Sequence, residues 1–379
     1  MPARTQANLR RVALLIGQLG LGGAERQVTL LAQELHRRGV GVSVLLLVRG
    51  GPHEAALRAA GIPVHHLGFI GWRSGPLAPV RNVRAFARMV RLLRRIKPDV
   101  LHAFLMESYL LGAPAARLAG VPVVVSGRRR LSDFNRQRKR VFALGTMATH
   151  LADQVVANAV AVARDARTVE RIPAHKISVI YNGLSRSAFD PVDPERVDTR
   201  LPVVLCVANF RPPKGHRHLI EAAAILAREG RPCTFALVGD GTEQEDLESR
   251  TRALGVDVRF LGAYTDVRPL LAGADVVVLP STSEGLSNAI MEAMAAARPI
   301  VATAVGGNSE LLEDRGVLVP PADPLALSKG ILRVLDDQEF AQRIATAARA
   351  WARKNLDLDT MVDEHVALYH RLLKERRAK

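Results

Sequence analysis

The feature that most constrains the fold of this chain is an alternation of short apolar runs with longer stretches of helical periodicity. The runs recur through both halves of the 379 residues, at 12–16, 42–48, 99–104, 122–126, 154–158, 203–209, 234–239, 275–280 and 299–303. Continuous apolar strands separated by helices are typical of parallel sheets that are buried on both faces. The pattern therefore predicts an α/β protein of doubly wound, Rossmann-like parallel sheets, with ligands at the carboxyl ends of the strands.

The length and one break in periodicity predict how the chain divides. A chain of 379 residues is long enough for two domains, each with its own core. Residues 179–202 contain Asn-Gly and three prolines and lose the periodicity, which is typical of a linker. We therefore expect two facing domains, 1–190 and 191–355, and a C-terminal helix at 356–379 that crosses back to the N-terminal domain.

Positive charge is concentrated in the first half of the chain. The whole sequence carries a formal net charge of +16, with 53 Lys+Arg and 37 Asp+Glu. Residues 1–190 hold 29 of the basic and 10 of the acidic residues, a net charge of +19, which leaves −3 for the remainder. This asymmetry predicts a polyanionic neighbour for the N-terminal half. Aromatic residues make up only 4% of the chain, so nucleic acid is not the expected partner.

Two arginine clusters indicate where that neighbour binds. Arginines 81, 84, 88, 91 and 95 recur along one helical face, whereas Val83, Phe86, Val90, Leu93 and Ile96 fall largely on another. A second basic cluster follows at 127–140. A solvated face accounts equally well for the first stripe alone. Together with the charge asymmetry, the clusters favour contact with an anionic membrane surface or with the pyrophosphate of a lipid-linked acceptor.

Other features of the sequence bear on its compartment. Cys206 and Cys233 lie within or beside apolar runs, where a buried structural thiol is expected, and so small a number of cysteines fits a reducing compartment. The first apolar run is too short for a secretory signal, and no stretch of about 18 apolar residues follows. We therefore expect a cytoplasmic protein that contacts the inner face of the membrane peripherally.

A glycine-rich turn follows the first apolar run. Gly20, Gly22 and Gly23 stand where the chain leaves a strand and opens a helix, a position that favours bound anions. The spacing departs from G-x-G-x-x-G, so a dinucleotide fingerprint is not indicated. A tight turn with close helix packing is the alternative explanation.

A second candidate anion site follows the run at 203–209. This strand ends near Asn209, and a proline-stiffened loop then carries Arg211 and Lys214 to the start of a helix. Cations at a helix start face the positive end of the helix dipole, which is unfavourable unless an anion compensates their charge. A bound diphosphate would be such an anion, and an ordinary solvated loop is the alternative explanation.

The segment from Thr282 to Pro299 carries two carboxylates, Glu284 and Glu292, around a helix that is otherwise nearly uncharged. Ser287 or Asn288 is the expected N-cap of this helix. A lone carboxylate among small apolar residues is typical of one that accepts hydrogen bonds from a specific ligand. We expect the amides of Gly285, Leu286, Ser287 and Asn288 to hold phosphate oxygens, with Glu292 on a ribose and Glu284 on a sugar.

These motifs together resemble the retaining family 4 glycosyltransferases of the GT-B fold, whose E-x7-E signature corresponds to Glu284 and Glu292. The resemblance extends, in order along nearly the whole chain, to the glycine loop, "VANFRPPKGH", "VGDG", "FLGAYTDVRPLLAGADVVVLPS" and "ATAVGGNSELL". It implies a hexosyltransferase of polysaccharide biosynthesis. Such an enzyme moves a sugar from a nucleotide sugar, most often a UDP-sugar, to a glycan or lipid-linked acceptor with retention of configuration.

The resemblance also implies roles for individual residues. Lys214 and Arg211 are expected to stabilise the leaving diphosphate and Glu284 to contact the donor sugar, which makes these three the catalytic candidates. The donor-binding set adds the glycines and amides named above, Glu292 and Asn209; it comprises Gly22, Gly23, Asn209, Arg211, Lys214, Glu284, Gly285, Leu286, Ser287, Asn288 and Glu292.

The sequence departs from the family at two places. Asn209 stands where relatives commonly have arginine, and Gly127, Arg128 and Arg129 follow a strand that in many relatives leads to a histidine. His102 and Arg128 are the candidates on the acceptor side. A core role is the alternative for His102.

No metal or other cofactor is expected. The one Asp-x-Asp, Asp357-Leu-Asp359, precedes the last helix and is better explained as its cap, and no His/Cys cluster has zinc spacing. Two other functions remain open from the sequence. One is a sugar-nucleotide epimerase with the same fold, and the other is a non-catalytic polyanion-binding protein.

Overall fold

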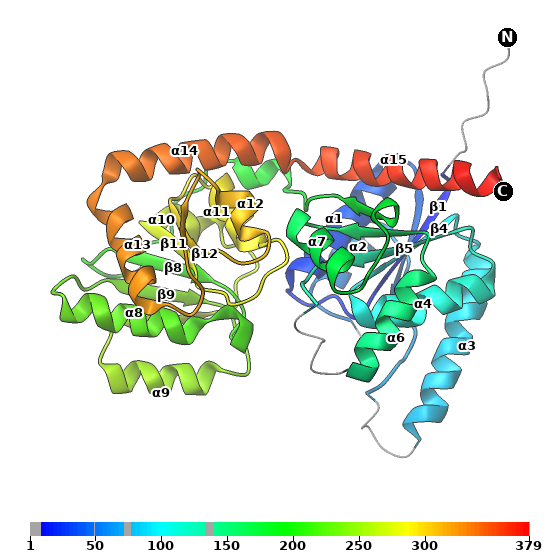
Figure 1. Ribbon diagram of the computed structural model, residues 1–379, viewed down its shortest axis with the longest axis horizontal. Coiled ribbons are helices and arrows are strands. Elements are labelled where there is room, and N and C mark those ends of the chain that lie inside the picture. The colour runs from blue at the N-terminus through cyan, green and yellow to red at the C-terminus, as the bar shows by residue number, and fades with distance from the viewer. Residues whose placement is uncertain (1–8, 49, 72–76, 133–138, 379) are drawn as a thin grey trace, which may run out of the picture. The chain divides into compact units, whose positions relative to one another are not determined.

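The protein divides into two compact units, and the C-terminal helix belongs to the first of them. The computed structural model describes residues 9–48, 50–71, 77–132 and 139–378. One unit comprises Met1–Gly183 with Leu358–Lys379, and the other comprises Leu184–Asp357 (Figure 1). The division at Gly183 and Leu184 comes earlier than the predicted boundary at 190, because the segment after it packs on the second unit. Glu195, for example, donates its backbone N–H to the carbonyl of Pro269 at 3.0 Å.

The described residues of the first unit contain a seven-stranded parallel sheet in the order β3-β2-β1-β4-β5-β6-β7. Its strands are β1 (Arg11–Ile16), β2 (Gly41–Leu46), β3 (Val64–His66), β4 (Val100–Phe104), β5 (Val123–Arg128), β6 (Gln154–Ala157) and β7 (Ile177–Val179). Its helices are α1 (Gly23–Arg37), α2 (His53–Ala59), α3 (Ala78–Ile96), α4 (Met106–Ala119), α6 (Lys139–His150), α7 (Val160–Thr168) and α15 (Leu358–Arg377).

Alternate residues of each central strand supply two separate cores. Val12, Leu14 and Ile16 of β1 belong to the core that includes α1 and α15. Ala13 and Leu15 of the same strand belong to the core that includes α3 and α4. Both faces of the sheet are therefore buried, as the continuous apolar runs predict.

The second unit contains a six-stranded parallel sheet in the order β10-β9-β8-β11-β12-β13. Its strands are β8 (Val203–Val207), β9 (Thr234–Val238), β10 (Val258–Gly262), β11 (Val276–Leu279), β12 (Ile300–Thr303) and β13 (Val317–Val319). Its helices are α8 (His216–Arg228), α9 (Gln244–Leu254), α10 (Arg268–Gly273), α11 (Asn288–Ala295), α12 (Asn308–Leu312), α13 (Pro324–Asp336) and α14 (Gln338–Asn355).

In each sheet the first strand lies in the interior. The following strands are added toward one edge, and the later strands are then added toward the other edge. The chain builds β8, β9 and β10 toward one edge and then returns to place β11 on the other side of β8. The same reversal separates β1 from β4 in the first unit. Loops that leave neighbouring strands at such a reversal diverge, and this is where doubly wound sheets bind their ligands. The predicted fold, two doubly wound α/β domains, is confirmed.

Cys206 and Cys233 are free and buried, as expected. No helix within the described ranges has the length and apolar character needed to cross a bilayer.

The assignment of α15 to the first unit can be tested by truncating its buried face. Leu373 of α15 is 3% exposed in the same core as Leu31 and Leu35 of α1. We expect Leu373→Ala to lower the free energy of unfolding of the first unit by about 2–4 kcal/mol, because it leaves a cavity there. Urea titration followed by circular dichroism measures the change. Arg371→Ala, at an exposed position on the same helix, is the control, and equal effects of the two substitutions would contradict the packing of α15.

Candidate functional site

Two loops of the second unit meet where its strand order reverses. Residues 208–215 follow β8 and residues 280–287 follow β11, and these strands are neighbours in the sheet. The N–H of Thr282 donates to the carbonyl of Pro213 at 2.8 Å, which joins the loops directly. The site predicted from Arg211, Lys214 and Glu284 therefore draws its residues from both sides of the reversal.

A glycine makes this close approach possible. Gly215 adopts φ +70°, and a Cβ added there would lie 2.1 Å from the carbonyl oxygen of Pro280. The left-handed backbone and the lack of space both favour glycine. Gly215 thus lets the loop that carries Lys214 turn into α8 directly against the end of β11.

Lys214 and Glu284, two of the three predicted catalytic residues, form an ion pair. The Nζ of Lys214 lies 2.5 Å from Oε1 of Glu284. The hydroxyl of Ser281 donates to the same oxygen at 2.7 Å. The side chain of Glu284 is 8% exposed and that of Lys214 is 26% exposed, so the carboxylate is fixed inside while the ammonium group stays accessible. The position of the accessible ammonium group is thus set by two loops.

The N-terminus of α11 adjoins this ion pair. Ser287 caps the helix, since its Oγ accepts a hydrogen bond from the N–H of Ile290 at 3.3 Å, as predicted. Gly306, at φ +51°, allows the loop after β12 to pack on the backbone of Glu284, and the N–H of Gly307 donates to the carbonyl of Gly285 at 2.6 Å. An ordered helix start beside a lysine is suited to a bound anion.

Glu292 lies one turn into α11 and is buried, with 9% of the residue exposed. Leu286 and Asn288 complete the loop and the start of the helix. Thus Lys214, Glu284 and the predicted residues up to Glu292 on α11 lie in one region at the carboxyl end of the sheet. Their contacts with a ligand stay predictions.

Arg211 and Asn209 occupy the loop after β8. Arg211 is exposed, and its carbonyl accepts the N–H of Lys214 at 2.9 Å. Asn209 is half-buried, and within the described part of the chain its Oδ1 has no hydrogen-bond donor. A role for Arg211 in place of the usual arginine at the Asn209 position therefore stays a prediction.

Gly22 and Gly23 belong to the first unit. They link β1 to α1, and Gly22 is the N-cap, with an extended backbone and no side-chain cap. The role of these two glycines in donor binding stays a prediction.

His102 and Arg128, the acceptor-side candidates, are both buried in the first unit. His102 is 0% exposed, and its Nδ1 lies 2.7 Å from the hydroxyl of Tyr369. Arg128 is 7% exposed and forms an ion pair with Glu170, while its Nη2 donates to Thr149 at 2.9 Å. These contacts explain both side chains as parts of the interior. The expectation that they face an acceptor stays a prediction, which the pairing of Arg128 with Glu170 and of His102 with Tyr369 does not support.

Three residues that complete the site, Ser281, Gly306 and His216, lie within the quoted family segments but were not singled out in the sequence. The hydroxyl of Ser281 donates to Glu284, and Gly306 packs on the backbone of Glu284 from the loop after β12. His216, the first residue of α8, is 0% exposed, and its ring lies 5.0 Å from that of Phe210. Only the position of His216 directly after Lys214 and Gly215 could have drawn attention to it.

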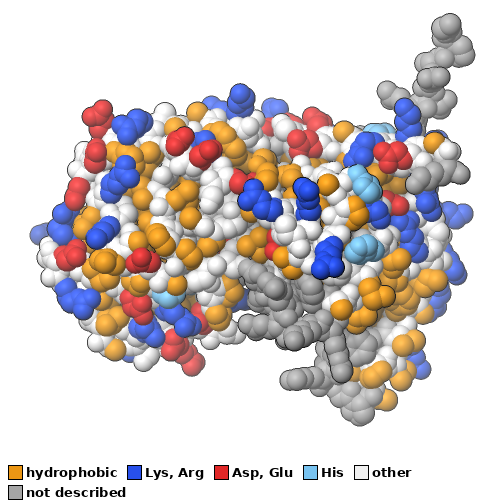
Figure 2. All heavy atoms as spheres, in the orientation of Figure 1, with side chains coloured by type: hydrophobic (Ala, Val, Ile, Leu, Met, Phe, Trp, Pro, Cys, Tyr) orange, Lys and Arg blue, Asp and Glu red, His pale blue; other side chains and the backbone are white. Residues whose placement is uncertain are grey.

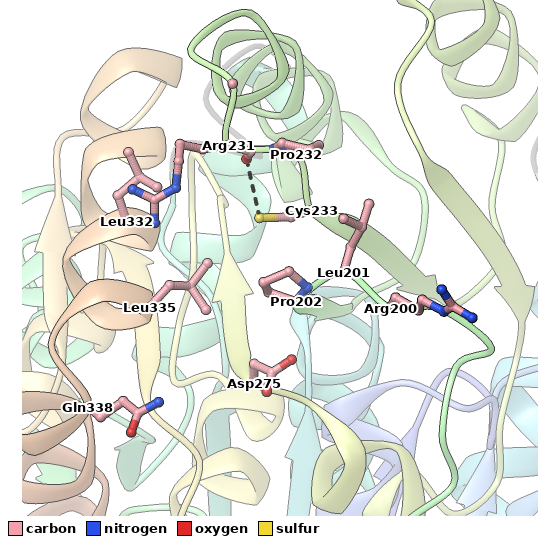
Figure 3. A pocket seen from close by; sticks show the side chains of 11 residues that line it. Arg200, Leu201, Pro202, Arg231, Pro232, Cys233, Asp275, Leu332, Leu335 and Gln338 are labelled. Carbon is pink, nitrogen blue, oxygen red and sulfur yellow. Dashed lines mark hydrogen bonds between the residues drawn. The ribbon is translucent and has the colours of Figure 1, made fainter.

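A cavity of about 490 Å³ lies at the opposite end of the second unit's strands (Figure 3). It is lined by Leu201, Pro202, Pro232, Cys233 and Asp275, which directly precede β8, β9 and β11, and by Leu332 and Leu335 of α13. Because ligands of doubly wound sheets bind at the carboxyl ends, this cavity is separate from the candidate site.

Metal ligands do not cluster in the described ranges, where no group of three or more His, Cys, Asp or Glu side chains could hold a metal ion. Asp359 lies in the first turn of α15 and accepts a hydrogen bond from Nη2 of Arg38 at 3.0 Å.

Comparison with protein families matches each half of the chain. Residues 21–187 match the model described as Glycosyltransferase Family 4, and residues 201–337 match that of Glycosyl transferases group 1.

Relatives of known name are similar along most of the chain. An alpha-D-kanosaminyltransferase of Streptomyces kanamyceticus is 29% identical, over 91% of this chain and 98% of its own length. The lipopolysaccharide core biosynthesis glycosyltransferase LpsE of Rhizobium meliloti is 28% identical, over 92% of this chain and 95% of its own. Among solved structures, Anabaena HepE in complex with UDP and glucose is 25% identical with a TM-score of 0.81, covering 94% of this chain and 98% of that one.

The burial of His216 predicts a dependence of stability on pH. Burial and, secondarily, the charge of Lys214 lower the pKa of His216 from 6.5 to about 4. Between these values the unfolded chain binds a proton that the folded protein does not, so this contribution to stability is lost as the pH falls from about 6.5 to 4. We expect His216→Leu to reduce the loss by up to roughly 3 kcal/mol.

Thermal unfolding across pH 4–8 measures this difference. His175→Leu, at an exposed position, is the control. A variant at position 216 with the wild-type pH dependence would contradict the burial of a neutral imidazole.

Proposed function

Because the chain belongs to the family 4 glycosyltransferases of the GT-B fold, we propose that it transfers a sugar from a UDP-sugar to a glycan or lipid-linked acceptor, with retention of configuration and without a metal ion. The observation that carries this proposal is the Lys214–Glu284 ion pair beside the start of α11, at the reversal of the second sheet. This is the place in a doubly wound domain where a nucleotide diphosphate is expected.

The named relatives support a uridine nucleotide. The Anabaena HepE structures contain UDP, UDP with glucose, or UDP-glucose, and their fold matches this chain over 94% of its length. By analogy we assign the diphosphate to Lys214, Arg211 and the amides at the start of α11. Glu292 then holds the ribose and Glu284 contacts the sugar.

The ion pair is compatible with catalysis at the diphosphate. An ammonium group has three N–H donors, so Lys214 can keep its bond to Glu284 and donate to a phosphate oxygen as well. When the sugar–phosphate bond breaks, negative charge grows on the diphosphate, and a cation already fixed beside it stabilises that charge without reorganisation. Lys214, Arg211 and the helix dipole together supply the positive charge that a metal ion would otherwise provide.

The acceptor is proposed from relatives and from charge. One relative, 27% identical over 68% of this chain and 72% of its own length, is an Escherichia coli galactosyltransferase whose name gives diphosphoundecaprenol as part of its acceptor. Two others are named for lipopolysaccharide core biosynthesis. A lipid-linked acceptor is in keeping with the basic first half of this chain.

The exposed face of α3 supplies a surface for an anionic membrane. Leu77, Val80 and Val83 are 68%, 49% and 69% exposed, and α3 contains arginines but no acidic residue. Val83, which was expected largely on another face than the arginines, is therefore exposed like them. We call Leu77, Val80, Val83, Arg81, Arg84 and Arg91 the α3 surface. Apolar side chains among arginines suit the boundary between anionic headgroups and acyl chains. Figure 2 shows hydrophobic side chains at the lower right, over the part of the first unit that contains α3, α4 and α6.

The family assignment favours transfer over the two alternatives. An epimerase would release a new nucleotide sugar without an acceptor, so product analysis separates it from a transferase. A non-catalytic polyanion-binding protein would bind RNA or DNA with a steep dependence on salt, regardless of Glu292.

The donor site is tested by calorimetric titration with UDP in buffer that contains EDTA. We expect wild-type protein to bind UDP and Glu292→Ala to bind it roughly tenfold or more weakly, because a charge-assisted hydrogen bond to ribose is lost. Lys214→Ala should reduce turnover more than UDP affinity if the lysine acts mainly on the leaving group.

Glu245→Ala is the matched control for this titration, since Glu245 is an exposed glutamate near the start of α9. An unchanged dissociation constant for Glu292→Ala would rule out the ribose role. Binding by wild-type protein that requires Mg²⁺ would overturn the metal-independent donor site.

The α3 surface is tested by co-sedimentation with vesicles of phosphatidylglycerol and phosphatidylcholine. Reversal of charge at Arg81, Arg84 and Arg91 should lower the bound fraction severalfold, since each basic residue near an anionic surface contributes about 1 kcal/mol. The same number of reversals at Arg228, Arg252 and Lys329, which are exposed in the second unit, is the control. Equal binding by both triple variants would return α3 to an ordinary solvated face.

A further inference from the structure

Two consecutive arginines at the end of β5 are buried in opposite electrostatic settings. Arg128 forms an ion pair with Glu170 and donates to Thr149. Arg129 is 6% exposed, yet no carboxylate within the described residues pairs with it. Unlike Arg128, Arg129 is therefore a buried cation without an anionic partner among the described residues.

The contacts of Arg129 satisfy only part of its hydrogen-bonding capacity. Its Nη1 donates to Oδ1 of Asn182 at 2.6 Å, and its guanidinium lies 5.1 Å from the centre of the Phe104 ring. The Nε atom has no acceptor among the described residues. A neutral amide and a ring face compensate a buried charge less well than a carboxylate does.

The surroundings of Arg129 add no negative charge. Burial lowers the pKa of His102 and brings that of His365 to about 3, while burial raises the pKa of Tyr369, so all three are neutral near pH 7. Burial also lowers the pKa of Arg129 to about 10, which leaves it charged. This cluster of four side chains thus carries one uncompensated positive charge.

Two histidine nitrogens in the same cluster also lack partners. The Nδ1 of His365 lies 2.8 Å from the carbonyl of Met361, so this nitrogen is the donor and Nε2 of the neutral ring is an acceptor. Neither Nε2 of His365 nor that of His102 has a hydrogen-bond partner within the described part of the chain. Buried polar atoms of this kind normally bind water or a ligand.

Arg129 lies at the ligand-binding end of the first sheet. It directly follows β5, and the N–H of Leu105 donates to the carbonyl of Gly127 at 3.2 Å, which holds the start of α4 against the same strand. This 14-residue helix has no side-chain cap, so its positive end adds to the charge of Arg129. The acidic residues nearby are Glu107, exposed in the first turn of α4, Glu170, which is engaged by Arg128, and Asp165, which accepts hydrogen bonds from the N–H and the hydroxyl of Ser132.

We propose that Arg129 is an anion-binding residue of the first unit, which takes a phosphoryl or carboxylate group of the acceptor. The assignment to an acceptor rests on the function proposed above, whereas the binding of an oxyanion rests on the contacts of Arg129 alone. The bound oxyanion supplies the missing counter-charge and an acceptor for the Nε–H. The acceptor of this enzyme is accordingly an anionic molecule.

The test is thermal unfolding of the wild type, Arg129→Gln, Arg129→Lys and Arg130→Gln against sodium phosphate, sodium pyrophosphate and sodium acetate. Ionic strength is held constant with NaCl, and UDP is present at the concentration that saturates the calorimetric site, so that the donor diphosphate position is filled. Arg130→Gln is the matched control because it removes the same charge one residue along, at an exposed position.

We expect the oxyanion to raise the melting temperature of the wild type and of Arg130→Gln by roughly 5 °C at one hundred times its dissociation constant. Arg129→Gln should lose this shift, and Arg129→Lys should retain part of it. Without added anion, Arg129→Gln should melt about 2–4 °C above the wild type, because an uncompensated buried charge is removed. A purely structural arginine would instead melt lower when replaced.

The choice of anion distinguishes the sources. A response to phosphate or pyrophosphate supports a phosphoryl acceptor, and a response to acetate alone supports a carboxylate such as that of a uronic acid. An equal shift in the wild type and in Arg129→Gln would overturn the proposal. UDP titration of each variant separates the donor-site hypothesis from the Arg129 hypothesis. If the wild type does not bind UDP, the donor site is refuted, and the anion-dependent shift in melting temperature then tests Arg129 alone.

Discussion

The burial of both faces of the central parallel strands is the constraint on which the rest of this protein depends. Val12, Leu14 and Ile16 of β1 pack on one side of the sheet, and Ala13 and Leu15 on the other, so the interior of a central strand has no room for exposed polar chemistry. Functional side chains are therefore confined to strand ends and the loops that follow them. Lys214 and Glu284 lie on the loops after β8 and β11, and Arg129 lies directly after β5.

The same constraint explains how much of the fold could be predicted. All nine apolar runs correspond to strands, and each is flanked on both sides by other strands of its sheet. The four strands that were missed, β3, β7, β10 and β13, are the sheet edges. An edge strand is covered less completely, as the partly buried residues of β7 and β10 illustrate, so its sequence lacks a continuous apolar run. The contacts divide the units at Gly183 and Leu184 and not at 190, because the Pro-rich segment that follows has the composition of a linker but packs on the second unit.

The candidate site could be predicted in composition but not in geometry. Residue types and their positions at strand ends indicated Lys214, Glu284 and the Ser287 cap, because these depend on local sequence. The ion pair between Lys214 and Glu284 joins loops 70 residues apart, and it follows only from the strand order that makes β8 and β11 neighbours. Ser281 and Gly306 lie in quoted segments, but their contacts with Glu284 depend on how the loops pack together, which the sequence does not show.

Net charge was the least specific of the sequence signals, since the described arginines of the first half include three different environments. Some are paired internally, as Arg128 with Glu170 and Arg38 with Asp359, and these contribute nothing to an external field at close range. Those of α3 are exposed beside apolar side chains, where an anionic surface would stabilise them. Arg129 is buried without a carboxylate, so its charge acts only over the short distance to a bound group. Within the described residues, the arginines behind the excess of +19 over residues 1–190 thus include structural ones, surface ones and Arg129, and each kind requires its own measurement.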